Sequence, residues 1–157
     1  GTAVLDEAHN LRSFLRRHHH IFLDTSIFIY FVEQHPRYYL LCDQIFEAVE
    51  AGSVRASTST LTLLEILVQP YRRKADDLVL RFYSLLQSYP NLGWVPLTLE
   101  IADLAARLRA ERLLETPDSV QAASAICAGA TGFICNDADF RRVEEIECLV
   151  LEECFGA

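Results

Sequence analysis

Short apolar runs alternate with segments of helical periodicity along nearly the whole of this chain. Five such runs predict buried strands, at residues 21–24, 54–57, 94–97, 133–135 and 148–151. The segments between them predict helices that begin near residue 26 and cover about 37–51, 61–68, 74–88, 99–113 and 117–129. Strands and helices in this order are typical of an α/β fold with a mostly parallel sheet, in which ligands bind beyond the carboxyl ends of the strands.

One domain accounts for most of the chain, since 157 residues fall within the usual size of a single domain. Residues 1–20 differ from the rest, because their amphipathic helical pattern has no strand beside it. We interpret them as an N-terminal arm or an engineered extension, and residues 21–157 as the domain. We interpret His18, His19 and His20 as a tag remnant or part of a solvated arm, with metal binding as the alternative.

The composition predicts a folded protein of the cytoplasm. Hydrophobic residues make up 51% of the chain and charged residues 23%, which is incompatible with general disorder. No apolar run approaches the roughly 18–20 residues of a membrane span, and acids stand where a secretory leader would be basic. The five cysteines form no CxxC pair, which favours buried thiols in a reducing compartment over disulfides or a zinc site.

The net charge of −8 comes from 22 acidic residues against 14 lysines and arginines. A protein that coats nucleic acid without specificity would be basic, so this balance argues against that class. It leaves open a metal-dependent nuclease, whose acids gather in one site where bound cations neutralise them.

Acidic residues follow two of the predicted strands. Asp24 comes directly after the first strand, and Asp137 comes after the fourth, with Asp139 two residues further on. Because the strands of a parallel sheet end at one edge, these side chains are expected at that edge. Each also has a plain structural interpretation, as the cap of a helix or as an ordinary turn residue.

Two further acids are expected to point toward the same edge from helices. Glu65 is the single charge in the apolar run LTLLEILV, where a carboxylate is costly unless it is paired or bound to a metal. Asp118 follows Thr116 and Pro117 and lies in the first turn of a helix, where the helix dipole favours its charge. Strengthening that helix start is the structural alternative for Asp118.

Four carboxylates from four elements would repel one another if they were left bare. Oxygen ligands without cysteine or histidine suit Mg²⁺ or Mn²⁺, and such an ion would activate water for attack on a phosphodiester. A phosphatase of the haloacid-dehalogenase type fits less well, because it needs a second aspartate where this chain has Ser26.

Around these acids the chain resembles the PIN-domain ribonucleases, in particular the VapC-type toxins of bacterial toxin–antitoxin pairs. The similar segments are IFLDTSIFIYF, STLTLLEILVQP, TPDSVQAASA and ICNDADFRRV, which occur in the family's order between about residues 21 and 151. The resemblance implies a three-layer α/β/α sandwich around a five-stranded parallel sheet and Mg²⁺- or Mn²⁺-dependent cleavage of RNA. It also implies a homodimer and a small antitoxin protein as partner.

The resemblance carries the family's functional positions onto this chain. The implied catalytic and metal-binding acids are Asp24, Glu65, Asp118 and Asp137, with Asp139 also a metal-ligand candidate and the alternative to Asp137 as the fourth acid; the supporting residues are Thr25, Ser26 and Asn136. The expected products carry a 5′-phosphate and a 3′-hydroxyl. Members commonly have threonine or serine where this chain has Cys135, so one supporting contact is expected to be weaker.

Contacts to RNA must come from basic residues outside the acidic site. The candidates are Arg141 and Arg142, just after the fourth motif and the best placed, and the run of Arg72, Arg73 and Lys74; the structural alternative for each is a solvated face or an ion pair. The main alternative to a nuclease is a non-catalytic PIN-like module that binds RNA or a protein partner. A nuclease of the same fold that works without an antitoxin is the third possibility.

Overall fold

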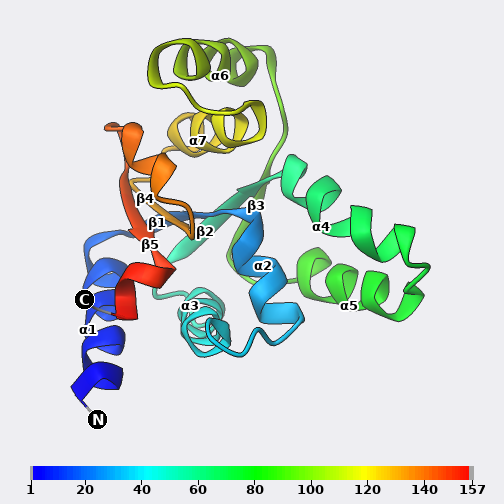
Figure 1. The fold of residues 1–157 in the computed structure, drawn as a ribbon, viewed down its shortest axis with the longest axis vertical. Coiled ribbons are helices and arrows are strands. Elements are labelled where there is room, and N and C mark those ends of the chain that lie inside the picture. Colours follow the sequence, from blue (N-terminus) through cyan, green and yellow to red (C-terminus); the bar gives the residue numbers. More distant parts are fainter. Residues whose placement is uncertain (1, 156–157) are drawn as a thin grey trace.

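Five parallel strands form one sheet in the order β3-β2-β1-β4-β5 (Figure 1). The computed structural model describes the backbone of residues 2–155 and the side chains of residues 10–155. The strands are β1 (His20–Leu23), β2 (Arg55–Ser59), β3 (Leu92–Val95), β4 (Gly132–Cys135) and β5 (Glu147–Val150). The helices are α1 (Thr2–Arg17), α2 (Thr25–Val32), α3 (Tyr39–Glu50), α4 (Thr60–Arg72), α5 (Asp76–Gln87), α6 (Leu99–Arg112) and α7 (Thr116–Ala128), with the short 3₁₀ helices η1 (Ala138–Arg142) and η2 (Leu151–Phe155).

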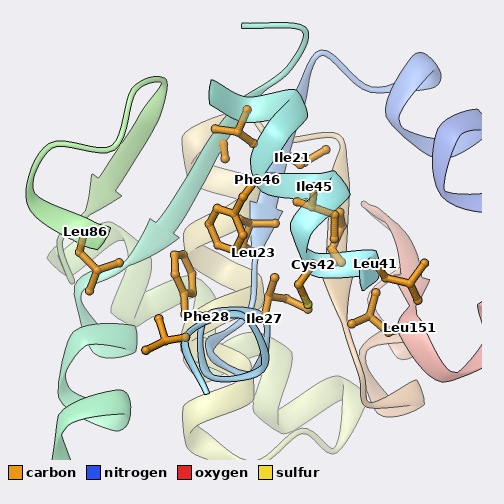
Figure 2. Close-up of a cluster of buried hydrophobic side chains, with 14 of the residues drawn as sticks. Ile21, Leu23, Ile27, Phe28, Leu41, Cys42, Ile45, Phe46, Leu86 and Leu151 are labelled. Carbon is orange, nitrogen blue, oxygen red and sulfur yellow. The ribbon is translucent and has the colours of Figure 1, made fainter. Parts of the chain in front are cut away.

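Helices cover both faces of the sheet, with α6 and α7 on one side and α2 and α3 on the other (Figure 1). The side chains of β1 alternate between these layers. Ile21 and Leu23 join the core beneath α2 and α3 (Figure 2), whereas Phe22 joins the core beneath α6 and α7. Phe22 stacks there on Phe133 of the neighbouring strand β4, with ring centroids 5.3 Å apart. The predicted α/β/α sandwich with a five-stranded parallel sheet is confirmed.

Two predicted boundaries are wrong, and prolines are involved in both. We expected this helix to end near residue 68, ahead of Pro70, but α4 continues to Arg72 with Pro70 buried inside it. A proline there removes one backbone hydrogen bond, and burial of its ring offsets part of that loss. We expected the third strand at 94–97, but β3 ends at Val95, because Pro96 cannot donate to a sheet.

The N-terminal helix is packed against the rest of the fold. Leu11 and Phe14 of α1 are buried, and α1 lies beside η2 at the C-terminal end of the chain (Figure 1). His18 is only 7% exposed, so its interpretation as part of a solvated arm is wrong. The division of the chain at residue 20 stays a prediction.

The apolar segment 42–49 belongs to the core: Cys42, Ile45 and Phe46 are buried (Figure 2), and so is Val49. Among the described residues, no helix is long and apolar enough to cross a membrane.

Candidate functional site

The acids singled out in the sequence come from four elements of the fold. Asp24 is the N-terminal cap residue of α2 directly after β1, and its backbone N–H donates to the carbonyl of Ile134 in β4, 3.0 Å away. Asp137 follows β4, the strand beside β1. Glu65 lies on α4 and Asp118 in the first turn of α7. The structure thus places Asp24 and Asp137 beyond the carboxyl ends of adjacent strands.

Electrostatic interaction links these acids across the site. Burial is the main cause that raises the pKa of Asp24 to about 7, and the charges of Asp118 and Glu65 raise it further. Burial likewise leads the causes that raise the pKa of Asp118 to about 6, followed by the charges of Asp137 and Glu65. The carboxylates therefore lie close enough to oppose one another's ionisation.

Four of these acids have no basic partner among the described side chains. Among the residues with described side chains, Asp24, Glu65, Asp118 and Asp137 form no ion pair with lysine, arginine or histidine. Asp139 differs, because its carboxylate is 3.2 Å from Arg142. Asp137 caps η1 through one oxygen, Oδ1, which accepts from the Asp139 backbone N–H at 2.9 Å.

The donor set suits a hard divalent cation, since it consists of uncompensated carboxylate oxygens. In the arrangement shown, however, the side chains do not meet around one point. Within the described part of the chain, no group of three or more histidine, cysteine, aspartate or glutamate side chains is close enough to hold a metal ion. The residues fit such an ion by their chemistry and charge, and binding it would need the carboxylates to move closer together.

Glu65 is held by polar side chains from two other helices. The hydroxyl of Thr25 in α2 donates to Glu65 Oε1 at 2.7 Å, and Nε2 of Gln121 in α7 lies 3.3 Å from the same oxygen. Nε2 of Gln121 is also 3.0 Å from the hydroxyl oxygens of both Thr25 and Thr62. Gln121 is not among the site residues predicted from the sequence, although it follows Asp118 by three residues and is the one amide in a run of small residues.

The other supporting residues take different positions. Ser26 Oγ donates to Asp24 Oδ2 at 3.3 Å. Asn136 points to neither acid: its Nδ2 donates to the Tyr30 hydroxyl at 3.0 Å, and its Oδ1 accepts from the backbone N–H of Glu152 at 2.9 Å. Asn136 therefore fixes the loop after β4 to α2 and η2.

Cys135 is fully buried at the end of β4, and its Sγ lies 3.4 Å from the backbone carbonyl oxygen of Asp137. A thiol is a weak donor, so this contact holds the loop less firmly than a hydroxyl would.

The basic candidates for RNA contact fall into two groups. Arg141 is paired with Glu153, and Arg142 is paired with Asp139. Arg72, Arg73 and Lys74, by contrast, are exposed at the end of α4 and form no ion pair with any residue whose side chain is described.

Comparison with known proteins identifies the protein family. The family model of the PIN domain matches residues 21–146, and the chain belongs to that family. No curated protein matches the chain significantly.

Solved structures of toxin–antitoxin complexes share the fold. VapBC2 from Rickettsia felis, bound to a DNA fragment from its promoter, is 18% identical with a TM-score of 0.64, over 83% of this chain and 98% of that one. A toxin–antitoxin complex from Klebsiella pneumoniae is 20% identical with a TM-score of 0.63, over 83% and 97%. VapBC-5 from Mycobacterium tuberculosis is 22% identical with a TM-score of 0.56, over 84% and 98%. The predicted membership of the PIN family is thereby confirmed, and the chain shares the fold of these VapBC structures.

Proposed function

We propose that this protein is a Mg²⁺- or Mn²⁺-dependent endoribonuclease, and that it acts in the cytoplasm as the toxin of a toxin–antitoxin pair. One observation carries the proposal: four carboxylates, without a basic partner among the described side chains, gather beyond the strand ends of a PIN domain, and burial together with the neighbouring acids raises the pKa of Asp24 and of Asp118. Uncompensated charge of this kind costs stability and is characteristic of sites that bind a cation.

The residues of the site have different proposed roles. Asp24, Glu65, Asp118 and Asp137 would hold the ion, with Asp139 kept at the rim by Arg142. A divalent ion supplies Lewis acidity at the phosphate and lowers the pKa of water. Thr25 holds Glu65 through its hydroxyl, and Ser26 does the same for Asp24. Asn136 and Cys135 support the loop that carries Asp137.

The strand of RNA would follow α4 away from the acids. Arg72 follows Glu65 by seven residues, so both lie on the same face of α4, about 10 Å apart along its axis. Arg72, Arg73 and Lys74 have no competing ion pair with any residue whose side chain is described, whereas a phosphate would have to displace Glu153 or Asp139 to reach Arg141 or Arg142. The basic run at the end of α4 is therefore our main candidate for phosphate contact.

The antitoxin partner is proposed because the similar structures are toxin–antitoxin complexes. The homodimer rests on the family resemblance. Light scattering of the purified chain, alone and co-expressed with a small protein encoded beside it, tests both assemblies.

RNA cleavage is the decisive test of the activity. A mixture of tRNA and mRNA is incubated with the protein in Mg²⁺, in Mn²⁺ and in EDTA, beside an Asp24→Asn variant. We expect cleavage that needs the metal and that the variant lacks. If the folded, metal-loaded protein binds RNA without cutting it, the alternative of a non-catalytic RNA-binding module replaces this proposal.

A further inference from the structure

Gln121 is buried at the junction of three helices. It is 1% exposed, and its side-chain nitrogen joins α7 to the hydroxyl groups of Thr25 on α2 and Thr62 on α4, each at 3.0 Å. Thr62 and Thr25 are themselves fully or nearly fully buried. These three side chains and Glu65 form one polar network inside the fold.

The number of available hydrogens gives this network a direction. Thr58 Oγ1 lies 2.8 Å from both the carbonyl of Leu23 and Oγ1 of Thr62. Thr58 shares its one hydrogen between the Leu23 carbonyl and Thr62, and Thr62 also accepts from Nε2 of Gln121, which can only donate. Gln121 then gives one hydrogen to Thr62 and the other to Thr25.

This direction ends at Glu65. Since Thr25 accepts from Gln121, its own hydrogen is free to go to Glu65 Oε1, 2.7 Å away. If the amide were turned round, the oxygen of Gln121 would compete for the hydrogen of Thr25, and an ionised Glu65 would lose its donor. The amide orientation and the charge of Glu65 therefore support each other.

The same orientation leaves a defect. Oε1 of Gln121 is buried without a hydrogen-bond partner. Every other buried side-chain nitrogen or oxygen in the described part of the chain has such a partner. An unsatisfied buried acceptor costs about 1–3 kcal/mol. An apolar side chain of similar size would avoid this cost, so stability alone does not account for a glutamine here.

We propose that Gln121 is a positioning residue for the metal site, acting through Thr25 on Glu65. By donating to Thr25 it directs the Thr25 hydroxyl onto Glu65 Oε1. Glu65 Oε2 accepts no hydrogen bond from any residue whose side chain is described, which leaves that oxygen for a divalent cation. The inference rests on the proposed function and assigns a role to a residue that neither motif nor charge had marked.

The test compares Gln121→Met with Gln44→Met in the full-length protein. Methionine has nearly the size of glutamine but no donor, and Gln44 is a partly buried helical residue on α3. Mn²⁺ affinity is measured by titration calorimetry or electron paramagnetic resonance, and Tm is measured without metal. Partners behind metal ligands typically contribute 10–100-fold to affinity. We expect Gln121→Met to weaken Mn²⁺ binding about 10-fold or more while Tm changes by no more than a few degrees, and Gln44→Met to change neither.

A double variant separates positioning from mere packing. If Gln121 acts through Thr25, Gln121→Met should weaken Mn²⁺ binding less than about 2-fold further in a Thr25→Val background, because residues on one path are not additive. Thr25→Ser, which keeps the hydroxyl, should retain the affinity. Gln121→Leu replaces the methionine variant if that one does not fold.

Three outcomes overturn the inference. The first is an unchanged Mn²⁺ affinity in a folded Gln121 variant, and the second is a fall in Tm without a change in Mn²⁺ affinity. The third is that Gln121→Met weakens Mn²⁺ binding as much in the Thr25→Val background as it does in the wild-type protein. The proposed function fails separately, if the wild-type protein binds Mn²⁺ and cleaves no RNA.

Discussion

Glu147 and Asp24 lie at opposite edges of the sheet, and their pKa values are shifted in opposite directions. At the amino edge, where β5 begins, Glu147 pairs with Arg17 and with His18 Nε2, and these contacts, led by Arg17, lower the pKa of Glu147. At the carboxyl edge, Asp24 has no basic partner, and burial with neighbouring acids raises its pKa to about 7. Glu147 thus contributes to stability at the amino edge, while a charged Asp24 at the carboxyl edge costs stability in the absence of a cation.

This difference indicates where the molecule does its chemistry. Ion pairs hold α1 against the sheet at one edge, whereas at the other edge Asp24, Glu65, Asp118 and Asp137 pair with no basic residue whose side chain is described, and only the outer acid Asp139 of this group pairs with Arg142. Strongly perturbed, uncompensated carboxylates are more characteristic of a functional site than of a structural one. Variants that change one edge and not the other test this difference between the two edges.

The largest effect is expected from Asp24→Asn. The change removes one carboxylate from the proposed ligand set, so RNA cleavage should fall by more than about 100-fold, beyond the usual effect of a residue behind the ligands. Cleavage of RNA under Mn²⁺ is the measurement. Asp139→Asn is the matched control, because Asp139 is held by Arg142 at the rim, and its loss should reduce cleavage much less. Equal losses in the two variants would contradict the difference between these acids.

Stability without metal should fall as the pH rises from about 4 to about 7. In this window the folded protein keeps a proton on Asp24 that the unfolded chain has already released, so raising the pH favours unfolding. The expected loss is roughly 2–4 kcal/mol, measured by urea denaturation at several pH values. Glu147 contributes in the opposite sense, since its lowered pKa gives stability that is present at neutral pH and is lost only in acidic solution.

Asp24→Asn and Mn²⁺ should each flatten this pH dependence. The asparagine has no proton to lose, and the cation compensates the charge of the folded protein. A profile that keeps its slope in the Asp24→Asn variant would show that other groups cause it.

Gly132 provides a test confined to the amino edge. A Cβ at this position would lie 2.8 Å from Phe14 Cζ and 2.9 Å from His18 Cγ, so Gly132→Ala must push α1 and His18 away from β4. We expect a loss of about 1–3 kcal/mol in the free energy of unfolding. Cleavage of RNA per folded molecule should stay unchanged, because the acids lie at the other edge; a parallel loss of activity would show that the edges are coupled.

The sequence predicts the acids at the carboxyl edge of the sheet, but not the packing of α1 at the amino edge. Asp24 and Asp137 could be placed because each directly follows an apolar strand, and parallel strands end at one edge. The packing of α1 could not be predicted, since it depends on contacts of Phe14 and His18 with residues more than a hundred positions away.

The network of Gln121 was missed for the same reason. Its partners Thr25 and Thr62 lie 96 and 59 residues away in the chain, and no local periodicity reports such contacts. Pro70 was misread because local propensity predicts the end of a helix, whereas burial in the folded protein favours its continuation.

The smallest effect concerns the basic residues near the carboxyl edge. Arg72 forms no ion pair with residues whose side chains are described, while Arg141 is paired with Glu153. Arg72→Ala should therefore weaken RNA binding a few-fold and reduce its salt dependence by about one ion, because a phosphate contact releases a bound counterion. Arg141→Ala should have a smaller effect, since in the free protein its charge is already compensated. Binding of a short RNA to the Asp24→Asn protein, measured at several salt concentrations by fluorescence anisotropy, compares the two. If Arg141→Ala proves the more damaging, the RNA passes over η1 instead of along α4, and the ion pair with Glu153 opens when RNA binds.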